Sequence, residues 1–166
     1  MREPIFTEVP LNFLTGAFLN DVVEVRPGLC VDPMLLEPWS CRPDRCRPYL
    51  GPNLCCKVER RCTHFKGDLC TIHDRKPFGC TLFPLDLIRI GDTRVVTTVK
   101  NIGFFDTGWC RYDQDMLSCF EGVEEGRASM FEVQRPVLAR LFTRSEVILL
   151  EEALEAVRRK KGRPGR

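Results

Sequence analysis

Residues 85–99 read Leu-Asp-Leu-Ile-Arg-Ile-Gly-Asp-Thr-Arg-Val-Val-Thr-Thr-Val. Two runs rich in apolar and β-branched residues, 85–90 and 94–99, are separated by the tripeptide Gly91-Asp92-Thr93. Such runs, joined by a short segment that contains glycine, are typical of two antiparallel strands. The stretch therefore predicts a β-hairpin, which gives the fold its β component.

The sequence after the hairpin predicts helices. Thr143 can cap a helix with its hydroxyl while Glu146, three residues on, bonds back to the cap, an arrangement called a capping box. Apolar residues then recur at helical spacing and form a stripe that we expect to be buried. The stripe comprises Val147, Ile148, Leu150, Leu154 and Val157. Met116, Leu117, Phe120 and Val123 recur at the same spacing. Between the two patterns, Pro136 is expected in a first helical turn or at a break.

Upstream of the hairpin, residues 21–26 predict a strand that ends at the turn Pro27-Gly28. Five prolines between residues 33 and 52 exclude a long helix there and predict irregular backbone. With 166 residues, of which 43% are hydrophobic, the chain can build one domain with its own core. We therefore predict an α+β fold, a small single domain over residues 1–166. It combines an irregular cysteine-rich, metal-organised region with a β-hairpin and C-terminal helices.

Cysteine is concentrated in residues 41–80, where seven of forty residues are cysteine. That density is typical of a secreted disulfide scaffold or of a thiolate metal site. The first residues show no signal-peptide pattern, because Asn12, Thr15 and Gly16 interrupt the nearest apolar stretch. No run reaches the 18 apolar residues of a membrane span. We therefore expect a cytoplasmic protein with no membrane partner, whose reduced thiols bind metal rather than form disulfides.

Charge and spacing both fit thiolate ligands. Residues 41–80 hold nine Lys or Arg against four Asp or Glu, and thiolates favour basic neighbours, although a solvated basic loop is the alternative. Four residues separate Cys41 from Cys46, which lets two thiolates reach one tetrahedral zinc. Cys55 and Cys56 are adjacent, so in extended backbone they point to opposite faces and could serve two metals, or two irons of one cluster. The remaining gaps match neither zinc-finger nor ferredoxin spacing, so the pattern indicates metal without identifying it.

Residues 70–84 read Cys-Thr-Ile-His-Asp-Arg-Lys-Pro-Phe-Gly-Cys-Thr-Leu-Phe-Pro. This stretch resembles the signature Cys-x-Ile-Tyr-x-x-Arg-Pro-x-x-Cys-x-x-Phe-Pro of the YkgJ-like cysteine-cluster family, a zinc- or iron-chelating domain of the CxxCxxCC type. Cys62 sits where the family has a cysteine before the signature, and the four cysteines within 41–56 resemble its opening cluster. Cys110 best matches a further cysteine downstream. The resemblance thus covers residues 41–110.

The chain departs from the family pattern in three places. Residues 47–54 stretch the opening cluster, and the connection between Cys56 and Cys62 is shorter than is usual in the family. His73 and Lys76 replace the usual Tyr and Arg of the signature.

The resemblance implies eight thiolate ligands for zinc or an iron–sulfur cluster, and two tetrathiolate sites would use all eight. The candidates are Cys41, Cys46, Cys55, Cys56, Cys62, Cys70, Cys80 and Cys110. The adjacent pair and the basic surroundings favour iron–sulfur over zinc. His64 and His73 could be ligands, but a packing or hydrogen-bonding role is favoured for both. Outside the match, Cys119 is expected to be a small buried residue, and Cys30 could be a spare or substitute ligand.

The first functional hypothesis is a metal-binding module with a structural or electron-transferring role. Its partner is the metal ion or cluster, and a further protein partner stays open. The alternative is a cluster-dependent protein-modifying enzyme, because the flagellin lysine methylases resemble this family in carrying a similar cysteine-rich domain. The chain is short for that activity, lacks a Gly-rich nucleotide fingerprint and has only two histidines as general bases. Whether the chain is an enzyme stays open at this point.

A third hypothesis is nucleic-acid binding through a zinc-organised face and residues 158–166, of which six are basic. No aromatic residue lies among these charges to stack on bases, and a helix end attracts cations through its dipole. We therefore expect a flexible basic tail and no nucleic-acid partner.

Overall fold

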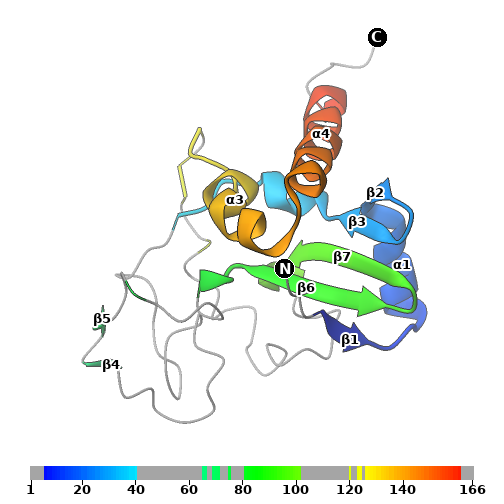
Figure 1. Cartoon of the computed structure of the whole chain (residues 1–166), viewed down its shortest axis with the longest axis horizontal. Helices are drawn as coiled ribbons and strands as arrows, with labels where there is room; N and C mark the ends of the chain where they lie inside the picture. Colours follow the sequence, from blue (N-terminus) through cyan, green and yellow to red (C-terminus); the bar gives the residue numbers. More distant parts are fainter. Residues whose placement is uncertain are drawn as a thin grey trace.

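A five-stranded mixed sheet lies at the centre of the computed structural model (Figure 1). The structure describes residues 6–40, 65, 66, 69–71, 75, 81–101, 120, 123, 124 and 126–161, with the backbone alone at 65, 66, 69 and 70. The strand order is β1-β6-β7-β3-β2. The strands are β1 (Thr7–Val9), β2 (Val23–Arg26), β3 (Leu29–Val31), β6 (Leu85–Ile90) and β7 (Thr93–Thr98).

The predicted hairpin over residues 85–99 is confirmed as β6 and β7. The two strands pair antiparallel from Leu85 opposite Thr98 to Ile90 opposite Thr93, and Gly91 and Asp92 form the turn. Gly91 has a φ of +57°, a left-handed conformation that glycine adopts without a steric penalty. Val99, which the sequence assigned to the strand, instead begins the short 3-10 helix η3 (Val99–Asn101).

The hairpin is extended on both sides by short strands. β1 lies parallel to β6, and β3 lies parallel to β7. The strand predicted over residues 21–26 is confirmed at Val23–Arg26, where β2 pairs antiparallel with β3 across the turn at Pro27 and Gly28. Among the described residues, these strands complete a sheet with the short strands β1 and β2 at its edges.

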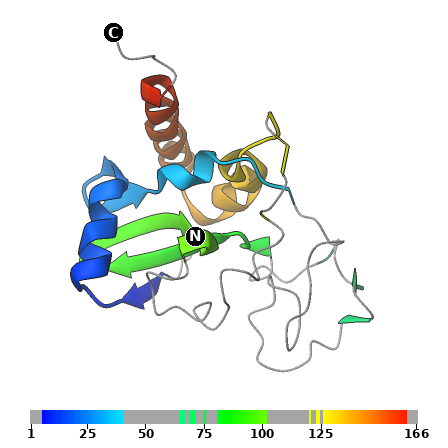
Figure 2. The ribbon, with the colours of Figure 1, turned by 180° about the vertical axis from the view of Figure 1, so that it is seen from behind.

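Helices cover both faces of the sheet. They are α1 (Phe13–Asp21), α3 (Met130–Leu141), α4 (Arg144–Lys161) and the 3-10 helix η1 (Pro33–Leu36). Figures 1 and 2 show α3 and α4 together beside the β6–β7 hairpin. The α+β class predicted from the sequence is therefore confirmed.

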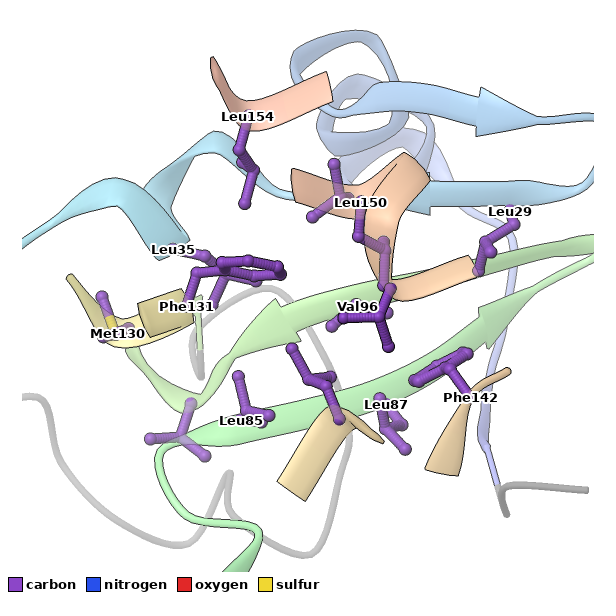
Figure 3. Close-up of a cluster of buried hydrophobic side chains, with 14 of the residues drawn as sticks. Leu29, Leu35, Leu85, Leu87, Val96, Met130, Phe131, Phe142, Leu150 and Leu154 are labelled. Atoms are coloured by element: carbon purple, nitrogen blue, oxygen red, sulfur yellow. The ribbon is translucent and has the colours of Figure 1, made fainter. Parts of the chain in front are cut away.

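Two apolar clusters lie on opposite faces of the sheet, because neighbouring residues of a strand point to opposite sides. On one face Leu87 and Val96 pack with Leu150 of α4, in the cluster that Figure 3 shows. On the other face Ile88 and Val95 pack with Phe18 of α1. Burial on both faces explains why the apolar residues of β6 do not strictly alternate with polar ones, since Leu87 and Ile88 are adjacent and face opposite clusters.

Helix α4 confirms most of the predicted C-terminal helix. Thr143 and Glu146 form the predicted capping box, in which the Thr143 hydroxyl accepts from the Glu146 backbone N–H at 3.3 Å and Glu146 accepts from the Thr143 backbone N–H at 3.0 Å. Val147, Leu150 and Leu154 are buried, and Val157 is half-buried. Ile148 was wrongly assigned to the buried stripe: it is 40% exposed, because it follows Val147 by one residue and turns about 100° away from the core.

The assignment of Pro136 to a first helical turn or a break was wrong. Helix α3 begins six residues earlier, where Ser129 and Glu132 form a capping box, and it continues through Pro136 to Leu141. Pro136 is exposed, so water can take the place of its missing N–H.

Two further predictions are tested only in part. The first four residues of the predicted flexible tail, 158–161, form the last turn of α4, whereas residues 162–166 lie outside the described residues. Met116 and Leu117 of the pattern predicted to be helical also lie outside them, and Val123 is described but not helical.

Candidate metal centre

Seven of the eight candidate thiolate ligands lie outside the described residues, as do His64, His73 and Cys119. Cys70 is the exception. It ends the two-residue strand β5 (Leu69–Cys70), which pairs antiparallel with β4 (Phe65–Lys66) so that Cys70 is opposite Phe65. The structure therefore describes the residues that flank the cysteine-bearing segments. The positions of these flanking residues limit where the cysteines can lie.

The two cysteine-bearing segments, 41–80 and 102–119, are continuous with residues that meet at one end of the sheet. Three aromatic rings lie there, those of Trp39, Phe83 and Phe120, and we call them the aromatic junction. The ring centroids are 6.1 Å apart for Trp39 and Phe83, 6.5 Å for Trp39 and Phe120, and 6.0 Å for Phe83 and Phe120. Edge-on and tilted ring pairs at such distances are favourable beyond the area they bury. The junction thus joins the start and end of the first segment to the end of the second.

A buried polar network fixes the start of the second segment to the same place. Asp32 is 5% exposed and accepts hydrogen bonds from the Thr97 hydroxyl and from the Asn101 side-chain amide, each at 2.6 Å. It also accepts from the backbone N–H of Met34 at 2.8 Å, which caps η1. Since Asp32 caps η1 and Asn101 ends η3, the network holds these two short helices together. Asn101 is also the last described residue before the second segment.

The environment of Asp32 raises the pKa of its carboxyl group. Burial is the main cause, because it disfavours the charged form, while the hydrogen bonds from Thr97, Met34 and Asn101 lower the pKa and oppose the shift. The nearby charge of Glu37 adds to the rise. The carboxylate is therefore a structural acceptor that depends on its three donors.

A second, half-exposed contact links the junction to the network. Lys100 forms an ion pair with Glu37, and its ammonium group lies 5.6 Å from the centre of the Phe120 ring. A cation over an aromatic face is attracted by the ring's negative charge density. Lys100 therefore connects η1, η3 and the aromatic junction.

Backbone hydrogen bonds fix the position of Trp39 itself. Its N–H donates to the Ala128 carbonyl at 3.1 Å, and the Glu37 carbonyl accepts from the Met130 N–H at 2.9 Å. Pro38 and Ser129 form an isolated antiparallel bridge between these two bonds. The chain thus enters the cysteine-bearing segment from a rigid position beside the start of α3.

The indole N–H of Trp39 provides a test of whether this frame suits a thiolate metal centre. The residue is 4% exposed, its Nε1 is buried, and among the described residues Nε1 has no hydrogen-bond partner. A buried donor without an acceptor costs about 1–3 kcal/mol. A donor held two residues before Cys41 fits a neighbouring acceptor such as a thiolate, so the residues present are compatible with such a centre.

Cys30 does not resemble a ligand. It lies in β3, is buried in the apolar cluster with Ile88 and Val95, and forms no disulfide. Burial, followed by the charge of Glu24, raises the pKa of its thiol, so the thiolate form that binds metal is disfavoured. The structure therefore gives no support to the possibility that Cys30 is a spare or substitute ligand.

Within the described part of the chain, no three His, Cys, Asp or Glu side chains form a group that could hold a metal ion. The same residues contain no helix that is long and apolar enough to cross a membrane.

Sequence reasoning did not identify Asp32, Trp39 or Asn101 as parts of this site. A local signal existed for one of them, since Asp before Pro is typical of the residue that caps a helical turn. The contacts of Trp39 and Asn101 join residues far apart in the sequence and leave no local pattern. Phe83, by contrast, belongs to the quoted signature. In the structure its ring packs against Trp39 at the aromatic junction.

Comparison with known proteins adds no relative: no family model, no curated protein and no solved structure matches the chain. The resemblance to the YkgJ-like cysteine-cluster family therefore stays a prediction from the quoted residues.

Proposed function

We propose that this chain is a metal-binding cysteine-cluster protein that holds an iron–sulfur cluster or zinc through thiolates, in a structural or electron-transferring role. The proposed ligands are Cys41, Cys46, Cys55, Cys56, Cys62, Cys70, Cys80 and Cys110. The observation that carries the proposal is the aromatic junction, because it brings the ends of both cysteine-bearing segments to one place.

Chain connectivity supports a common centre for the first and last cysteines of the run. Cys41 follows Trp39 by two residues, and Cys80 precedes Phe83 by three. A chain spans at most 3.3–3.6 Å per residue, so these cysteines lie within roughly 7 and 11 Å of the junction residues, Cα to Cα. Because the rings of Trp39 and Phe83 are 6.1 Å apart, the residues that flank 41–80 on both sides lie together.

The second segment supports the inclusion of Cys110. It starts after Asn101, which the Asp32 network holds, and it ends before Phe120 of the junction. The residues that flank 102–119 therefore lie close to those that flank 41–80. This supports a set of ligands in which Cys110 joins thiolates from residues 41–80.

The nature of the metal follows from chemistry rather than from geometry. The adjacent pair Cys55 and Cys56 suits a core with several irons, and the nine basic residues within 41–80 can offset the charge of the thiolates. Reduced thiols are required for either metal, so we infer that the protein works in the cytoplasm. Its first partner is the metal ion or cluster.

Purification without oxygen, followed by an absorption spectrum and by metal and sulfide analysis, tests the proposal. Brown protein with stoichiometric iron and acid-labile sulfide identifies the cluster, and colourless protein with about two zinc ions per chain identifies two tetrathiolate sites. Cys70→Ser should lower the metal content, whereas the control Cys30→Ala should leave it unchanged. Metal-free protein that stays folded with oxidised cysteines would overturn the proposal in favour of disulfides.

A further inference from the structure

We draw no further inference here: the strongest candidate, the exposed apolar patch that Leu11, Phe13 and Leu14 form at the start of α1, carries none, because nothing in the part of the chain that the structure describes shows what covers it.

Discussion

Replacing Asp32 with alanine tests the network that holds η1 and η3 together. The change removes the acceptor of three hydrogen bonds, from the Thr97 hydroxyl, the Asn101 amide and the Met34 backbone. A buried donor left without its acceptor costs about 1–3 kcal/mol. Burial of the Asp32 carboxylate is itself unfavourable, as its raised pKa indicates. Removing the carboxylate therefore offsets part of the loss from the three unpaired donors. We expect a net loss of about 2–4 kcal/mol in the free energy of unfolding.

Urea unfolding followed by circular dichroism measures this loss directly. For a chain of this length the same loss lowers the melting temperature by about 5–15 °C. The exposed control Glu152→Ala should change the free energy of unfolding by no more than about 0.5 kcal/mol. A double-mutant cycle with Thr97→Val should give a coupling energy of about 0.5–3 kcal/mol, because the two side chains share one hydrogen bond. A loss below about 1 kcal/mol for Asp32→Ala, with no coupling to Thr97, would refute the reasoning.

Three further predictions concern the described part of the fold. Leu150→Ala should cost about 2–5 kcal/mol because it leaves a cavity in the core, whereas the exposed Ile148→Ala should cost far less; equal losses in urea unfolding would contradict the assignment of the α4 faces. The hydrogen bond from Arg26 is the main reason that the pKa of Glu146 is lowered in the folded protein. Glu146 therefore stabilises the fold above its unfolded-state pKa, and this contribution is lost as pH falls through the lowered folded-state pKa. Glu146→Gln should reduce the loss of stability on acidification, measured by urea unfolding between pH 7 and pH 3. The buried Cys30 thiol, whose pKa is raised, should resist iodoacetamide in the folded protein and react after unfolding in urea, and modification of the folded protein, mapped by mass spectrometry, would argue against its position in β3.

The parts of the fold that the sequence predicted are those with strong local patterns. The β6–β7 hairpin has two six-residue runs around a turn that contains Gly91, and α4 has a capping box followed by a buried stripe. Helix α1 was missed because its apolar residues show no clear helical face, and Phe13 is 88% exposed. Strands β1 and β3 were not predicted, because three residues are too few to show a pattern. They are strands because they pair with the hairpin.

The candidate site also has parts that local sequence patterns predict and parts that they do not. Cysteine density and the signature around Cys70 and Cys80 predicted thiolate ligands from local sequence. The aromatic junction could not be predicted, because Trp39, Phe83 and Phe120 come together only through the fold. The hydrogen bond between Asp32 and Asn101, 69 residues apart, likewise forms only through the fold.

X-ray absorption at the edge of the bound metal is the most direct test of thiolate ligation. The protein should be purified without oxygen and measured with the metal it carries. The proposal predicts a first shell of about four sulfur atoms per metal at about 2.3 Å, with a further metal–metal shell if the centre is an iron–sulfur cluster. A first shell of oxygen and nitrogen, or protein that carries no metal at all, would contradict it.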